Sequence, residues 1–129
     1  MKKPLNYLEK KLKYMEKYLG KKGTPLYNAR KFKWTNQILK NGWAEYETWD
    51  FGGFVSPYLI ERLKMFKKLT NGIPQGKTEK EWFETLDKMI EAFELCAEEK
   101  HIACSDKKIL KKIETGLKLF GEYYTSIWW

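Results

Sequence analysis

Cysteine and histidine are scarce in this 129-residue chain, which has two cysteines and one histidine. Cys96 and Cys104 lie eight residues apart, and with His101 they match no standard zinc pattern, so we expect no metal and no cofactor. No run approaches the 18 apolar residues of a membrane span, and the start lacks the apolar centre of a signal peptide. We therefore expect a cytoplasmic protein with free thiols and no membrane contact.

A set of nucleophile, base and orienting group is also missing. The lone His101 has no carboxylate fixed beside it by sequence, and the serines fall only at turns or helix caps. Nucleophilic and acid–base catalysis need such groups held together. The sequence therefore favours a binding protein over an enzyme.

Acidic residues are few in the first third of the chain. Residues 1–40 contain twelve lysines and arginines against Glu9 and Glu16, a net charge of +10, whereas residues 41–129 carry −2. This asymmetry creates a one-sided positive field. It is explained either by a solvated lysine face or by attraction to phosphate in a nucleotide, a nucleic acid or an acidic partner.

Apolar residues recur at helical spacing in several stretches, which predicts an all-α fold, a compact bundle of four to five helices in one domain, 1–129. Its basic part is 1–40 and its core part is 41–129. Thr78 and Glu81 form a capping box before the clearest stripe, and Ser105 is the expected cap of the last helix. The expected helices cover residues 4–19, 26–40, 49–70, 79–99 and 106–128.

The stretch Gly42–Leu69 organises the chain. It begins with Trp43 and Trp49 among acidic residues and continues as a helix with a broad apolar face. Thr48 is the expected N-cap. Gly52 and Gly53 each cost about 1 kcal/mol of helix stability, which indicates close approach of a neighbouring helix or a ligand.

Two features predict a homo-oligomer. The first helix has a leucine seam in steps of three and four, which we expect to pack on the chain's own core, with pairing to a second subunit as the alternative. The chain also ends on Trp128-Trp129, and aromatic residues are enriched in interfaces. The seam consists of Leu5, Leu8, Leu12, Met15 and Leu19.

Four blocks of the sequence carry a family resemblance. They are Gly-Trp followed by Thr-Trp-Asp-Phe, Arg-Leu-Lys-Met-Phe, Thr-Glu-Lys-Glu-Trp leading to Leu-Asp-Lys-Met-Ile-Glu-Ala-Phe-Glu, and Lys-Ile-Glu-Thr-Gly-Leu-Lys-Leu-Phe-Gly-Glu-Tyr-Tyr. In this order they resemble a family of small uncharacterised phage-encoded proteins. Small phage proteins of this kind are often anti-defence factors, including helical oligomeric sponges for cyclic nucleotide signals, so the resemblance implies that role by analogy.

Three binding hypotheses follow: a sponge that sequesters a nucleotide immune signal, a nucleic-acid binder that uses the basic first third, and a protein–protein inhibitor or virion component. We favour the sponge because aromatic residues cluster around glycines at one helix entrance. Its ligand would be a cyclic nucleotide or another phosphate-bearing small molecule. Stacking faces and phosphate contacts are expected from Arg30, Lys31, Lys33, Trp43, Tyr46, Trp49 and Arg62.

Overall fold

The computed structural model describes residues 5–98 and 105–128. These residues form five α-helices and two short 3-10 helices, and they contain no strand, so the all-α prediction is confirmed. The elements are α1 (Tyr7–Leu19), α2 (Pro25–Asn41), η1 (Glu45–Thr48), α3 (Phe51–Leu69), α4 (Glu79–Ala97), α5 (Lys107–Tyr123) and η2 (Tyr124–Ser126).

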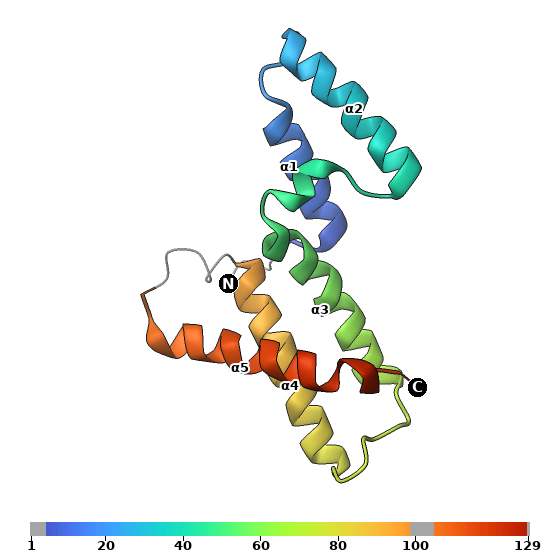
Figure 1. Cartoon of the computed structure of the whole chain (residues 1–129), viewed down its shortest axis with the longest axis vertical. Helices are drawn as coiled ribbons and strands as arrows, with labels where there is room; N and C mark the ends of the chain where they lie inside the picture. The colour runs from blue at the N-terminus through green and yellow to red at the C-terminus, as the bar shows by residue number, and fades with distance from the viewer. Residues whose placement is uncertain (1–4, 99–104, 129) are drawn as a thin grey trace.

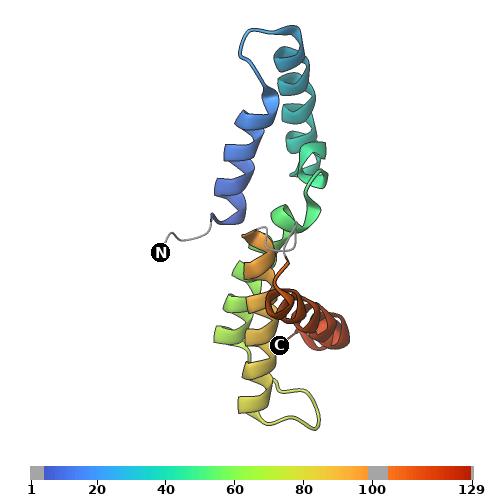
Figure 2. The same cartoon turned by 90° about the vertical axis from the view of Figure 1, so that its left-hand side faces the viewer.

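Helices α1 to α4 follow one long axis, and α5 lies across it (Figure 1). α1 and α2 form an antiparallel pair at one end, α4 and α5 lie at the other end, and α3 leads from η1 towards the second end. The turned view shows α5 standing out from the side of the α3–α4 pair (Figure 2). α3 is therefore the element shared by both ends of the molecule.

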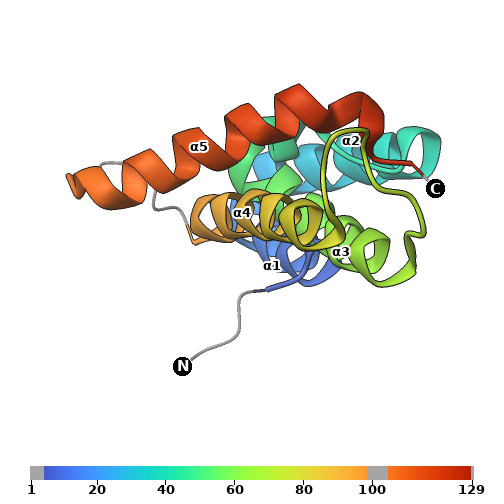
Figure 3. The same cartoon turned by 90° about the horizontal axis from the view of Figure 1, so that it is seen from below.

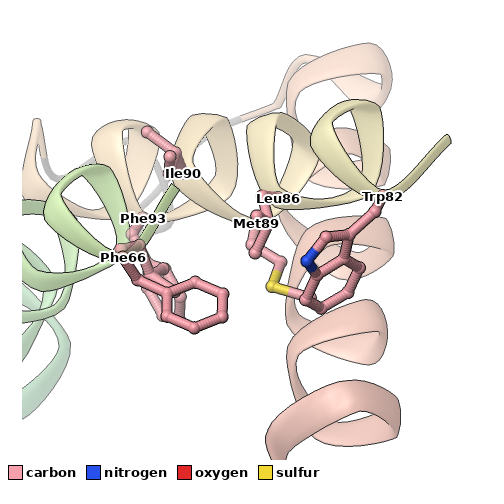
Figure 4. Packing of buried hydrophobic residues seen from close by; sticks show 7 residues of the cluster. Phe66, Trp82, Leu86, Met89, Ile90 and Phe93 are labelled. Atoms are coloured by element: carbon pink, nitrogen blue, oxygen red, sulfur yellow. The ribbon is translucent and has the colours of Figure 1, made fainter. Parts of the chain in front are cut away.

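One hydrophobic cluster fills the end made by α3, α4 and α5. Phe66 of α3 faces a row of α4 side chains that begins at Trp82 (Figure 4). α5 crosses α4 at Gly116, where an added Cβ would lie 2.2 Å from the Cβ of Ala92. Gly116 therefore permits a close approach of the two helices. The buried members of this cluster are Leu63, Phe66, Trp82, Leu86, Met89, Ile90 and Phe93.

A second cluster fills the end made by α1, α2 and η1. Trp34 and Tyr46 are fully buried at its centre, with ring centroids 4.8 Å apart, and Phe54 extends into it from the start of α3. The boundary between the clusters falls within α3, near Pro57. The count of one domain stays a prediction.

The first helix is turned differently from the sequence prediction. Leu8 and Leu12 are 61% and 60% exposed, so the middle of the seam does not pack on the chain's own core, whereas Leu19 is buried in the second cluster and Met15 packs against it. Lys10 and Lys11 are buried in place of Leu8 and Leu12. Burial of a lysine is tolerated where its ammonium finds acceptors or aromatic faces. Lys11 Nζ donates to the Gly42 carbonyl, and Lys10 Nζ lies 5.5 Å from the Phe54 ring centroid.

Two expected caps are displaced. Thr48 is not the cap of α3, because its hydroxyl donates to the Glu45 carbonyl within η1, and Asp50 Oδ1 accepts the N–H of Gly53 instead. At α5, Asp106 and not Ser105 is the cap, accepting from Lys108 N. In both cases a carboxylate, which is favoured at the positive helix end, takes the position expected for a hydroxyl.

Other predictions have mixed outcomes. The capping box of Thr78 and Glu81 is present. Within the described part of the chain, no helix is both long enough and apolar enough to cross a membrane. His101, Cys104 and Trp129 lie outside the described residues, as does Pro4, the expected start of the first helix. The oligomeric state and the localisation stay predictions.

Candidate functional site

The site begins at the turn between α2 and α3. Gly42 ends α2 in the left-handed conformation, with φ of 84°, and its N–H reaches the Ile38 carbonyl. The chain then folds back as η1 because Glu47 Oε2 accepts the N–H of Ala44 at 2.9 Å. Tyr46 fixes this turn to α1 by donating its hydroxyl to the Lys11 carbonyl at 2.9 Å.

A pocket of about 360 Å³ opens where η1 enters α3. Its walls come from α1, from the turn after α2, and from the first two turns of α3. Five of its eight lining residues are aromatic, which suits a flat apolar ring. The lining residues are Tyr7, Trp43, Glu47, Thr48, Phe51, Phe54, Val55 and Tyr58.

Glu47 provides a buried carboxylate in this wall. Its Oε1 accepts the Tyr7 hydroxyl at 2.6 Å, and its Oε2 lies 3.8 Å from Lys11 Nζ. Burial raises the pKa of Tyr7, and the hydrogen bond to Glu47 raises it further, so the phenol remains a donor to the carboxylate. The pocket therefore combines an aromatic lining with one fixed hydrogen-bond acceptor.

Arg62 lies beside the pocket without lining it. Its guanidinium carbon is 3.3 Å from the ring centroid of Tyr58, and Nη1 donates to the Tyr58 carbonyl at 3.1 Å. The Tyr58 ring in turn meets the ring of Tyr7 edge-on, at 5.5 Å. The side chain of Arg62 is 55% exposed, so its outer N–H groups face water at the rim.

Two of the predicted site residues, Trp43 and Arg62, therefore come together around Tyr58. Trp43 lines the pocket and is 48% exposed, which leaves ring surface free for stacking. Tyr46 is fully buried, so its ring cannot stack on a ligand without leaving the core. Gly53 does approach a neighbour closely, but that neighbour is protein: an added Cβ would lie 2.9 Å from Lys10 Nζ.

The other predicted residues gather on a separate surface. Trp49 packs against Tyr18 and Trp34, and the Arg30 guanidinium lies 5.6 Å from the Trp49 ring centroid. Arg30 Nη1 donates to the Tyr18 carbonyl at 2.6 Å. None of these residues lines the pocket at Trp43.

The remaining two lysines are not placed at the pocket either. Lys33 pairs with Glu45 at 3.0 Å, and this pair, with the indole N–H of Trp34, holds the pKa of Glu45 below its usual value. Lys31 is exposed, and its ammonium lies 5.8 Å from the ring centroid of Tyr27. The expected row of phosphate contacts from α2 is thus divided between an ion pair, a stacked arginine and a solvated lysine.

Sequence reasoning did not predict Tyr7, Glu47, Phe51 or Tyr58 in the site. The helical spacing of apolar residues places Phe51 and Tyr58 on the apolar face of the central helix, but they are 65% and 39% exposed. Their spacing of two turns was a usable signal for one shared face. Tyr7 comes from a helix 40 residues away from its partner Glu47, and no spacing rule predicts that contact.

Among the described residues, no group of three or more histidine, cysteine or acidic side chains is placed to hold a metal ion. Cys96 is a buried free thiol, and burial raises its pKa. Comparisons of the chain with protein families, curated proteins and solved structures give no match. The resemblance to small phage proteins therefore stays a prediction.

Proposed function

We propose that this protein sequesters a small nucleotide-type ligand in the pocket at Trp43, in the manner of a phage anti-defence sponge acting on an immune signal. The observation that supports this best is the pocket itself, which has five aromatic side chains and one buried acceptor. In this proposal the protein acts by binding the ligand and leaves it chemically unchanged.

The base of the nucleotide is the part that fits the pocket. A flat heterocycle between Trp43, Phe51 and Tyr58 would gain stacking energy from each ring face. Glu47 accepts from Tyr7 and from the Ala44 N–H, and a carboxylate has about four acceptor positions. A further position would accept an exocyclic amino group, so bases with such a group are preferred.

The phosphate would lie outside the pocket, at Arg62. A guanidinium presents several donors in a plane and binds phosphate oxygens in pairs. Arg62 uses one nitrogen on the Tyr58 carbonyl, and its contact with Glu61 is long at 4.0 Å. Its stacking on Tyr58 holds the guanidinium next to the wall that would contact the base.

A thermal-shift screen tests the proposal with cyclic dinucleotides, cyclic ADP-ribose isomers and NAD, followed by calorimetric titration of any compound that stabilises the protein. Because base stacking contributes about 1–3 kcal/mol, Trp43→Ala should weaken binding about tenfold or more. Arg62→Ala should weaken binding of the phosphorylated ligand and spare the free nucleoside. The bound ligand should be recovered intact by mass spectrometry.

Trp128→Ala is the matched control, because Trp128 is 75% exposed and does not line the pocket. Its affinity should equal that of the unmodified protein. Trp49→Ala separates the two surfaces of the predicted site, since a loss of affinity there would move the ligand to the Arg30 surface. Unchanged affinity of Trp43→Ala would overturn the proposed pocket.

The second candidate, nucleic-acid binding, is favoured by the lysines that stay exposed on α1, on α2 and in the turn between them. The structure describes Lys13, Lys17, Lys21, Lys22, Lys31 and Lys40 as exposed. Lys10 and Lys11 are buried and Lys33 is paired, so part of the +10 charge serves the fold. Binding of this kind would increase with oligonucleotide length and collapse with salt, which separates it from a pocketed ligand.

A further inference from the structure

The outer flank of α5 carries an apolar stripe that the fold does not cover. Leu110, Leu117 and Tyr124 are 39%, 43% and 64% exposed and follow one another at intervals of seven residues. Residues seven apart share one side of a helix. Among the described α-helices, α5 packs only against α4, which it crosses, and α5 runs along one edge of the molecule (Figure 3).

Gly121 lies in the same stripe, between Leu117 and Tyr124. An added Cβ there would meet nothing within 4 Å, so no contact inside the described chain requires a glycine. Glycine is the least favourable residue in a helix interior after proline. Because glycine has no side chain, Gly121 leaves room on the stripe for a facing helix to approach closely.

We propose that this stripe is the contact surface between two copies of the chain, with the two α5 helices antiparallel about a two-fold axis at Leu117. The intervals of seven are symmetric about that residue. An antiparallel copy therefore places Leu117 against its own equivalent and Leu110 against Tyr124, as a self-complementary interface requires.

Charges along the solvent edge of the stripe agree with this direction. They alternate in sign along the helix: Lys111, Glu114, Lys118, Glu122. Antiparallel pairing about Leu117 places Lys111 opposite position 123, next to Glu122 of the second copy, and Glu114 opposite position 120, between its Lys118 and its Glu122. Parallel pairing about a two-fold axis would instead put this edge and its equivalent on opposite sides of the pair, so these opposite charges would not meet. The contact between Lys111 and Glu114 within one chain is long, at 3.9 Å, and both side chains are exposed.

The exposed leucines of α1 fit a second copy less well. Glu9 and Glu16 lie on the same edge beside Leu8 and Leu12. A two-fold pairing of α1 about Leu12 would bring Glu9 towards Glu16, and Lys13, which lies between them on this edge, towards its own equivalent. Trp128, which follows the last helical residue, is a different surface from the α5 stripe, because the stripe lies mainly on regular helix.

Light scattering at micromolar concentration tests the proposal. The unmodified chain should have twice the monomer mass of 15.5 kDa. Leu117→Glu should be monomeric with an unchanged circular dichroism spectrum, whereas Leu8→Glu, the matched control on α1, should remain dimeric. A monomeric unmodified chain would overturn the proposal, and so would a dimeric Leu117→Glu variant.

Two further sets of variants, a charge exchange and a set of cysteine substitutions, keep the test independent of folding. Lys118→Glu should weaken the dimer, and the double variant with Glu114→Lys should restore it, because both positions are exposed on α5. In a Cys104→Ser background, Leu117→Cys should form a disulfide with its own copy. Leu110→Cys should instead link to Tyr124→Cys, since only residues with Cα atoms within about 7 Å can be bridged. Efficient self-linking of Leu110→Cys would indicate parallel pairing and overturn the antiparallel arrangement.

Discussion

At the scale of single residues, two buried tryptophans differ in the hydrogen bonding of the indole N–H. Trp34 and Trp82 are 1% and 0% exposed. The indole Nε1 of Trp34 donates to Glu45 Oε1 at 3.1 Å. The Nε1 of Trp82 has no hydrogen-bond partner among the described residues. A buried donor without a partner lowers stability by about 1–3 kcal/mol.

We therefore expect Trp82→Phe to cost less stability than Trp34→Phe, by about 1–3 kcal/mol in the free energy of unfolding. The two substitutions remove similar apolar surface, but the first also removes an unsatisfied donor, and the second breaks a hydrogen bond to a carboxylate. Urea titration followed by circular dichroism measures both values. Equal losses would show that the Trp82 N–H has an acceptor.

The contacts of single residues also explain which residue roles could not be predicted from the sequence. Lys10 and Lys11 are buried because acceptors and rings distant in sequence surround their ammonium groups, including the Gly42 carbonyl. Gly42, Glu47 and Phe54 belong to other elements, so the 3.6-residue periodicity of α1 does not predict that the two lysines are buried. Trp43 was predicted for the site because its aromatic and glycine neighbours are local in sequence.

At the scale of elements, helix positions are well predicted from the sequence because their signals are local. α2 ends at Gly42 and α4 begins after Thr78, as the left-handed glycine and the capping box indicate. The 3-10 turn η1 was not predicted. It is held by Glu47 and Tyr46, whose bonds to Tyr7 and Lys11 depend on α1.

The crossing of α4 and α5 gives the prediction at this scale. An added Cβ at Gly116 would lie 2.5 Å from the Lys88 carbonyl oxygen, and backbone cannot easily move aside. Gly116→Ala should therefore destabilise the protein by about 1–3 kcal/mol, despite the better helix propensity of alanine.

Gly121→Ala is the control on the same helix, because its new methyl group meets nothing within 4 Å. Measured in the Leu117→Glu background, where pairing of α5 is removed, it should raise the free energy of unfolding by up to about 1 kcal/mol. Thermal denaturation of both variants decides the matter. A stabilising Gly116→Ala would mean that α5 lies farther from α4.

At the scale of the whole molecule, two hydrophobic clusters share α3 and little else. The first cluster along the chain contains Phe54 and the second contains Leu86. In α3, Pro57 lies between the residues of the first cluster and those of the second, and it lacks the backbone N–H of a regular helix residue. Separate clusters joined by one helix need not unfold together.

We expect calorimetry of the Leu117→Glu variant to show a van't Hoff enthalpy smaller than the calorimetric enthalpy, the mark of more than one transition. Phe54→Ala should lower the temperature of one transition, and Leu86→Ala the other, because each removes a fully buried side chain from one cluster. A single two-state transition that shifts equally with both variants would show that α3 couples the clusters fully.

The division at Pro57 also bears on how the chain acquires its structure. The first cluster and the side chains packed on it span residues 14–54, and the second spans residues 59–127, so neither cluster needs a segment from the other. Contacts that are close in sequence form quickly, because little loop entropy is lost before they are made. During synthesis, the earlier cluster can thus assemble while the later half is still leaving the ribosome.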